Sequence, residues 1–196
     1  MEHDKERWEE RYSEDNIPWD LGKPYKQLVD YINENRPSRA LDVGCGTGTD
    51  AIYLAQNGFN VSAIDISEEA VRIAETKAQK AEVSIDFRLT NVLDMPFEDG
   101  TFEFTHDNGC FHSFEGSSSE ESDWRTYVKE MHRVMKSKAR YLMKCFSEEP
   151  SNPHRLSQET IRQYFSGNFN ILYMRPVVIK GKHGNHEGYS CLMERK

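Results

Sequence analysis

Long apolar runs are missing from this chain of 196 residues. No stretch of eighteen apolar residues occurs, so the sequence predicts no helix that spans a membrane. Residues 1–12 are too charged for a signal peptide. These absences predict a soluble, cytoplasmic protein with no membrane partner. The length is most simply that of a single domain with a substantial core.

Cysteine pairs and positive charge are also scarce. The cysteines lie far apart without a Cys-x-x-Cys pair, which argues against a zinc knot or a disulfide framework. They are Cys45, Cys110, Cys145 and Cys191. His183 and His186 are flanked by glycines and indicate a hairpin loop, so no metal ion is expected. The net charge of −8 argues against broad binding to a phosphate backbone, and hence against a nucleic-acid partner.

The most informative segment is an apolar strand that runs into alternate glycines. Ala40–Val43 predicts a buried parallel strand, and Gly44, Gly46 and Gly48 follow it before the chain becomes helical. Glycines allow a sharp turn and let a ligand approach the main chain. About twenty residues later, a second apolar strand ends at Asp65, a typical acceptor for a ribose diol. The segment therefore predicts the nucleoside-binding half of a Rossmann-like fold.

The spacing of the glycines narrows the choice of nucleoside. Thr49 stands where a dinucleotide fingerprint has its last glycine, and no Lys-Ser or Lys-Thr follows as in a P-loop. Leu41–Asp50 resembles motif I of the class I S-adenosylmethionine methyltransferases. The resemblance implies S-adenosylmethionine as cofactor. It implies as cofactor-binding residues Asp42, Gly44, Cys45, Gly46, Gly48, Asp65, Ile66, Asn91, Val92 and Asp107.

The N-terminal segment carries a second resemblance. Its Trp, Arg and Tyr precede a Pro-Trp-Asp-x-Gly-x-Pro run at 18–24, an order similar to that of the thiopurine, thiol, halide and tellurite methyltransferases. The runs 107–112, 145–147 and 154–157 are further matches, and the resemblance extends from about Trp8 to Phe169. It implies an acceptor pocket formed by Trp8, Arg11, Tyr12, Trp19, Phe111 and His112. Met135–Ala139 departs from the Leu-Lys-Pro-Gly-Gly turn that is usual before the fifth strand.

Strand and helix patterns alternate along the chain. Strands are expected at 40–43, 61–65, 83–88, 101–106, 139–146, 169–180 and 188–195. Most are separated by helical patterns, including one through Met135. This order predicts an α/β, Rossmann-like, doubly wound and mostly parallel seven-stranded sheet with an antiparallel C-terminal edge strand. We expect residues 1–36 to be a helical lid, 37–146 the cofactor-binding core, and 147–196 a C-terminal helix and hairpin.

The acceptor is suggested by the absence of an unmistakable base motif. A thiol ionises near pH 8.5 without help, whereas an alcohol, phenol or amine needs a base, for which His112 and Asp107 are the candidates. We therefore expect a small-molecule acceptor that is a thiol, a selenium or tellurium species, or a halide. Two alternatives stay open: an O-, N- or carboxyl-methyltransferase, and a binding protein without turnover. Trp8 and Tyr12 fit helix packing as well as substrate contact.

Overall fold

The computed structural model describes residues 2–114, 120–147 and 156–196. The expectations for His154 and Arg155 lie outside the described residues. The elements, in chain order, are α1 (Glu2–Ser13), α2 (Lys26–Glu34), β1 (Arg39–Val43), α3 (Thr49–Gln56), β2 (Asn60–Asp65), α4 (Glu68–Lys80), β3 (Asp86–Leu89), β4 (Phe102–Asn108), η1 (Phe111–Phe114), α5 (Glu120–Val134), β5 (Met135–Phe146), α6 (Gln158–Phe165), β6 (Phe169–Gly181) and β7 (Gly184–Arg195). In this part of the chain, no helix is long and apolar enough to cross a membrane.

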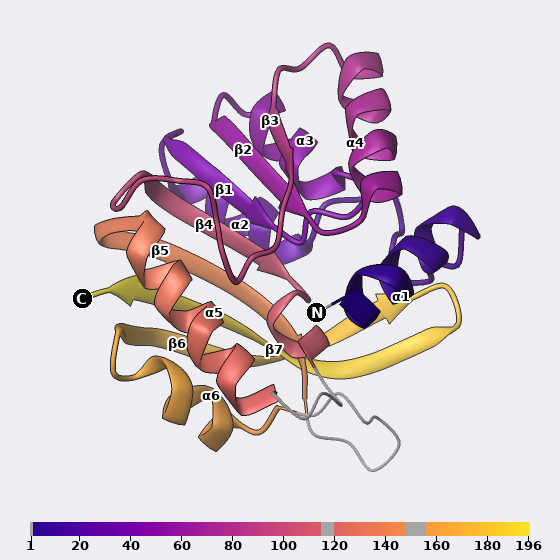
Figure 1. Cartoon of the computed structure of the whole chain (residues 1–196). Coiled ribbons are helices and arrows are strands. Elements are labelled where there is room, and N and C mark those ends of the chain that lie inside the picture. Colours follow the sequence, from indigo (N-terminus) through magenta and orange to yellow (C-terminus); the bar gives the residue numbers. More distant parts are fainter. Residues whose placement is uncertain (1, 115–119, 148–155) are drawn as a thin grey trace.

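The strands form one seven-stranded sheet in the order β3-β2-β1-β4-β5-β7-β6 (Figure 1). The pairs from β3 to β5 are all parallel, whereas β7 is antiparallel to both β5 and β6. The expected α/β, mostly parallel sheet with an antiparallel C-terminal strand is confirmed. That strand, β7, lies second from the edge, and β6 forms the edge itself.

Helices cover both faces of the sheet (Figure 1). On one face, α5 and α6 bury Tyr127, Met131 and Phe165 against side chains of β1, β4 and β5. On the other face, α2 and α3 bury Leu28 and Leu54 with side chains of β1, β2 and β4. The two layers leave the carboxyl ends of the parallel strands uncovered by helices of the core, and there the open side of an α/β sheet binds its ligands.

Helix α2 belongs to the core rather than to a lid. Leu28 is completely buried, and the ring of Tyr31 stacks on Phe104 of β4 with 4.3 Å between the centroids. A helical structure was expected for this part of the chain, but the inclusion of α2 in a lid of residues 1–36 does not fit this packing. A movable segment is therefore restricted to the chain before α2.

Leu28→Ala is expected to lower the free energy of unfolding by about 2–5 kcal/mol, because it leaves a cavity between α2 and the sheet. The measurement is urea denaturation followed by circular dichroism. Lys26→Ala on the same helix is the matched control, since Lys26 makes only an exposed ion pair with Asp30. A loss below 1 kcal/mol for Leu28→Ala would contradict the assignment of α2 to the core.

Two strands, β5 and β7, begin four residues earlier than the sequence predicts. Met135 is the first residue of β5 and pairs with Phe102 instead of ending the helix, because its buried side chain lies in the core. No separate turn precedes β5; Lys138, with φ of 63°, lies within it. The second difference is β7, which begins at Gly184 and closes a tight hairpin against Gly181. Its residues 184–187 were expected to be a loop.

Candidate active site

A cavity of about 470 Å³ opens at the carboxyl ends of the parallel strands. Residues from the ends of β1, β2, β4 and β5 line it, together with α1, the loop before α2 and the β6–β7 hairpin. Of the cofactor-binding candidates, those lining it are Gly44, Asp65, Ile66, Asn91 and Val92. Of the acceptor-pocket candidates, those lining it are Trp8, Arg11, Tyr12, Trp19 and His112. The volume is typical of a small-molecule site.

The glycine turn after β1 lets other elements pack closely on the main chain. Gly44, Gly46 and Gly48 all have positive φ. A Cβ at Gly46 would lie 2.7 Å from the Tyr12 hydroxyl, and one at Gly48 would lie 2.8 Å from the Cβ of Ala74 in α4. These glycines therefore bring α1 and α4 against the loop, in addition to permitting its backbone conformation.

Asp65, at the end of β2, joins the glycine turn to the start of α4. Its Oδ2 accepts a hydrogen bond from the Gly46 N–H at 2.8 Å, and its Oδ1 accepts one from Ser67 N–H at 3.0 Å. Burial raises the pKa of Asp65, while these two backbone donors oppose the rise. Each carboxylate oxygen can accept a second hydrogen bond, which fits a ribose diol in the cavity.

Asp42 is a buried acidic side chain beneath the turn. Its Oδ2 has no hydrogen-bond partner among the described residues. Burial raises the pKa of Asp42 to about 8, against the attraction of His106. An unpaired buried carboxyl oxygen is costly, so this position suits a cationic donor such as the ammonium group of S-adenosylmethionine. Together with Asp65 and the apolar side chains of Ile66 and Val92, Asp42 gives the site a set of residues that fits this cofactor.

The surface beyond Asp65 is suited to a flat base. Ile66 and Val92 supply apolar side chains to the cavity, and Asn91 lies beside them. The Asn91 Oδ1 accepts a hydrogen bond from Leu93 N–H at 2.9 Å, which fixes the orientation of the amide. Cys45, Gly46 and Gly48, which were also expected to bind the cofactor, are not among the residues that line the cavity.

An aromatic and cationic cluster covers the opposite wall. The Trp8 and Trp19 rings meet edge to face at 5.5 Å, and Tyr12 meets Trp19 at 6.2 Å. The Arg11 guanidinium lies 5.7 Å from the Trp8 ring and 5.2 Å from the Trp19 ring. Trp8 and Tyr12 therefore pack on each other and also line the cavity, and their contact with the substrate stays a prediction.

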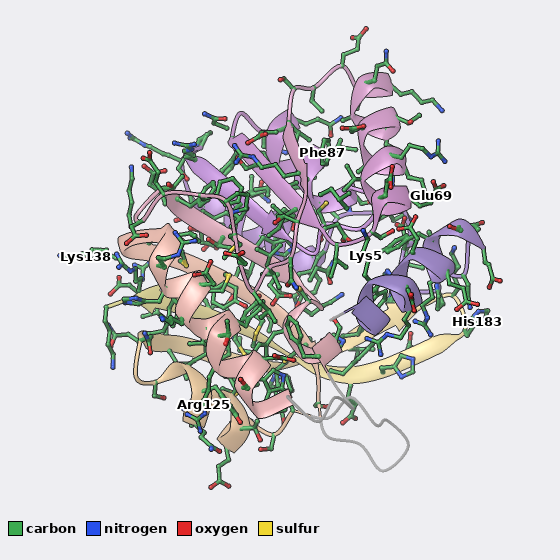
Figure 2. The ribbon with its side chains drawn as sticks, viewed as in Figure 1. Lys5, Glu69, Phe87, Arg125, Lys138 and His183 are labelled. Atoms are coloured by element: carbon green, nitrogen blue, oxygen red, sulfur yellow. The ribbon has the colours of Figure 1, made fainter. Side chains whose placement is uncertain are left out.

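Three sets of contacts hold the N-terminal segment over the cavity, in addition to the hydrogen bond that Arg7 donates to the Ser113 carbonyl at 3.0 Å. The Glu9 carboxylate accepts hydrogen bonds from Ser67 Oγ at 2.7 Å and from Glu69 N–H at 3.2 Å, at the start of α4. Lys182 N–H of the hairpin donates to the Pro18 carbonyl at 2.8 Å. Figure 2 shows Glu69 at the end of α4 nearest α1, and His183 at the tip of the hairpin that reaches alongside α1.

The third contact comes from Asp20, which ties the segment to the glycine turn. Thr47 Oγ1 donates to the Asp20 carboxylate at 2.5 Å, and Lys77 Nζ approaches the same carboxylate at 3.7 Å. Burial alone would raise the pKa of Asp20, but the hydrogen bond from Thr47 and the nearby Lys77 outweigh burial and lower it. The N-terminal segment is therefore attached to α4, the hairpin and the glycine turn.

The structure does not bring Asp107 or Phe111 to the cavity. The Asp107 carboxylate accepts from the N–H groups of residues 109, 110 and 111 and from the hydroxyls of Tyr127 and Tyr141. Phe111 is completely buried against Trp124, Tyr127 and Phe165. Both side chains were expected at the site, but they point into the core and fix the turn that carries His112.

His112 lines the cavity at the other side of this turn. Its ring lies 4.6 Å from the Phe146 ring, centroid to centroid. Nearby, Asn108 also lines the cavity, and its amide donates to Asp50 Oδ2 at 2.7 Å. Asp50 pairs in turn with the buried His106 at 3.0 Å. This buried network holds the end of β4 in place.

Sequence reasoning missed several lining residues. Among them are Arg7, Asn108, Phe146, Lys144, Lys180, His183 and His186. The signal for Lys144 was its position at the carboxyl end of β5, the same rule that selects Asp65. The hairpin residues gave no such signal, because a turn between two strands is ordinarily solvent-exposed. Among the described residues, no group of three or more His, Cys, Asp or Glu side chains is arranged to hold a metal ion.

Comparison with known proteins matches this chain to methyltransferases. A methyltransferase-domain family model matches residues 40–138. A 2-heptyl-1-hydroxyquinolin-4(1H)-one methyltransferase of Mycobacteroides abscessus is 23% identical, over 88% of this chain and 75% of the relative. The chain spans only 32% to 35% of the length of three further curated methyltransferases that it matches.

Solved structures share the fold. The 1,6-didemethyltoxoflavin-N1-methyltransferase of Burkholderia thailandensis, with S-adenosylhomocysteine bound, is similar with a TM-score of 0.80 at 16% identity, covering 98% of this chain and 87% of that one. TehB from Haemophilus influenzae is similar with a TM-score of 0.73 at 16% identity, covering 88% and 62%. These similarities extend across many methyltransferases and do not single out the thiopurine, thiol, halide and tellurite group.

Proposed function

This chain belongs to the methyltransferase domain family, and from that premise we propose that its methyl acceptor is a soft nucleophile: a thiol, a selenium or tellurium species, or a halide. The broader activity is S-adenosylmethionine-dependent methylation of a small molecule. The proposal concerns the acceptor atom and the residues around it. It also treats residues 2–22 as a lid on a single catalytic domain.

S-adenosylmethionine supplies an activated methyl group on a sulfonium sulfur. We assign its ribose to Asp65, its adenine to the surface formed by Ile66, Asn91 and Val92, and its methionine part to the turn at Gly44. The ammonium group of the bound cofactor would favour the ionised form of Asp42, whose pKa burial raises. The aromatic side chains of Trp8, Tyr12 and Trp19 would exclude water from the methyl group, which favours displacement at a sulfonium.

One observation carries the choice of a soft acceptor: among the described residues, no carboxylate base lines the acceptor end of the cavity. Among the described lining residues, Asp65 is the carboxylate, and it belongs to the ribose end. Both oxygens of Asp107 are occupied by hydrogen bonds within the core. An acceptor that ionises near neutral pH needs no such base, whereas an alcohol needs one.

His112→Ala is expected to reduce kcat with a thiol acceptor by less than about tenfold, because the thiolate forms without a base. The rate should rise with pH around the pKa of the acceptor and shift to lower pH for a more acidic thiol. Stopped assays of S-adenosylhomocysteine release across pH 6–10, with two thiols of different acidity, measure both effects. A profile that ignores the acidity of the acceptor would contradict the proposal.

The alternative is an oxygen or nitrogen acceptor. It is favoured by His112, an imidazole on the wall of the cavity that is able to act as a general base. The name of the hydroxyquinolone methyltransferase points the same way. For such an acceptor, His112→Ala would lower kcat by about a hundredfold or more.

A panel of acceptors tests the function directly. Release of S-adenosylhomocysteine is measured with thiols, selenite, tellurite, halides, phenols and amines under the same conditions. Turnover confined to the sulfur, selenium, tellurium or halide compounds supports the proposal. Turnover confined to phenols or amines supports the alternative, and binding of S-adenosylmethionine without any turnover would support a non-catalytic role.

A further inference from the structure

We propose that the acceptor end of the cavity is an anion site, in which Lys144 holds the acceptor in its negatively charged form. The inference rests on the proposed function, because it deepens the choice of acceptor. It concerns a residue that sequence reasoning did not select. The inference specifies the acceptor as a small monoanion such as a thiolate. A neutral thioether of the same compound should bind this site much more weakly.

The charge on the cavity wall is opposite to that of the protein. The chain carries a net charge of −8, yet its charged side chains on this wall are mostly cationic. The cations that line the cavity are Arg7, Arg11, Lys144 and Lys180. Among the described lining residues, the carboxylate is that of Asp65. Concentrating cations in a concave site of an acidic protein costs stability unless a bound anion offsets their repulsion.

Lys144 has no carboxylate partner within ion-pair distance among the described residues. Its Nζ lies 4.8 Å from the centre of the Tyr25 ring, a contact that holds the ammonium group beside the cavity. Burial lowers the pKa of Lys144, while Asp50 and Asp107 oppose this shift from a longer distance. An anion bound from the cavity would supply the close negative charge that this side chain lacks.

The position of Lys144 separates it from the ribose site. In the sheet order β2-β1-β4-β5, Asp65 ends β2 and Lys144 lies three strands away, next to Asn108 of β4. Neighbouring strands are about 4.8 Å apart, so the two side chains start roughly 14 Å from each other across the sheet. Arg11, on the N-terminal segment, lies over the Trp19 ring, and the next residue, Tyr12, approaches Gly46 of the glycine turn. Lys144 is therefore assigned to the acceptor, and Arg11 to the carboxylate of the methyl donor.

An anionic acceptor also balances the charges of the reaction. The acceptor gives its proton to water before it binds. Its sulfur then bonds to the methyl carbon with its own electron pair, and the pair of the broken sulfonium bond stays on the departing thioether. The positive and negative charges cancel, no proton moves, and the methylated product is neutral. The neutral product loses its attraction to Lys144, which favours its release.

The test compares the binding of two probes that differ at the reacting sulfur, which is an ionised thiolate in one and a neutral S-methyl ether in the other. 4-Nitrothiophenol, ionised at pH 7.5, and its S-methyl ether are titrated by calorimetry into the full-length protein saturated with S-adenosylhomocysteine, so that no methyl transfer occurs. We expect the wild-type protein to bind the thiolate at least tenfold more tightly than the thioether. Lys144→Met should reduce this preference to less than twofold, and Lys144→Arg should retain most of it.

Two controls make the result specific. Lys129→Met removes an exposed lysine of α5 that is not among the cavity-lining residues, and it should leave the preference unchanged. Binding of S-adenosylhomocysteine should be the same in Lys144→Met and in the wild type. Equal binding of thiolate and thioether by the wild type would overturn the inference. So would a weaker affinity of Lys144→Met for S-adenosylhomocysteine, because Lys144 would then serve the donor.

The inference and the proposed function fail in different ways. If the thiolate is preferred but only phenols or amines are methylated in the acceptor panel, the anion site stands and the choice of a soft acceptor is wrong. If thiols are methylated but the probes bind equally, the function stands and the anion site is wrong.

Discussion

Asp65→Ala is expected to weaken S-adenosylmethionine binding by about 1.5–3 kcal/mol, roughly ten- to 150-fold in Kd. The substitution removes the charged acceptor proposed for the ribose diol. It also leaves Gly46 N–H and Ser67 N–H without the oxygens that now hold them, so the glycine turn loosens. Isothermal titration of the purified protein with S-adenosylmethionine measures the loss.

Two further variants separate these contributions. Asp65→Asn keeps a side-chain oxygen at a similar position but no charge. Its affinity for S-adenosylmethionine should therefore lie between that of the wild type and that of Asp65→Ala. Asp94→Ala removes an exposed carboxylate near the same end of the molecule and should bind normally. Unchanged affinity in Asp65→Ala would reject the ribose assignment, and tight binding of NADH by the wild type would reject the cofactor.

Removal of residues 1–22 is expected to lower turnover by at least about a hundredfold while the sheet remains folded. The two main core clusters contain no residue from this segment, whereas Trp8, Tyr12 and Trp19 form one wall of the cavity. Without that wall, water reaches the methyl donor and the acceptor is no longer held in line with it. Product assays and circular dichroism on the same preparation measure both parts of the expectation.

Trp19→Ala keeps the chain intact and tests the wall without the deletion. Its loss of turnover should be smaller, and its thermal unfolding should stay close to that of the wild type. The deletion itself will cost some stability, because Glu9 caps the start of α4 and Ile17 packs with Ala70. Full activity after deletion would show that residues 1–22 are only a structural attachment.

The strand ends and the glycine turn could be predicted because their signals are local. An apolar strand, alternate glycines and an acidic strand end specify backbone shape and ligand contact within a few neighbouring residues. Asp65 therefore emerged from sequence together with its fold. A serine at the start of a helix is a similar local signal: Ser67 Oγ accepts the hydrogen bond from Ala70 N–H at 3.1 Å.

The remaining parts of the site depend on contacts between distant segments. The direction of Phe111 is decided by the five hydrogen bonds of Asp107, which no spacing reveals. Lys180 and His183 reach the cavity because β6 and β7 continue well past the sheet before they turn. Helix α2 looked like part of a lid because it precedes the first core strand, yet its partners lie on β1, β2 and β4.

The place of β7 between β5 and β6 has a consequence for how the molecule assembles. Strand β6 is made earlier along the chain, but its pairing partner in the sheet is β7, which follows it. The edge of β5 must therefore wait for the last strand, and this non-local pairing of β5 with β7 makes folding slow. During that interval β5 exposes an unpaired edge, the kind of surface on which chains associate. Chaperone demand and aggregation during synthesis should consequently respond most strongly to substitutions in β7.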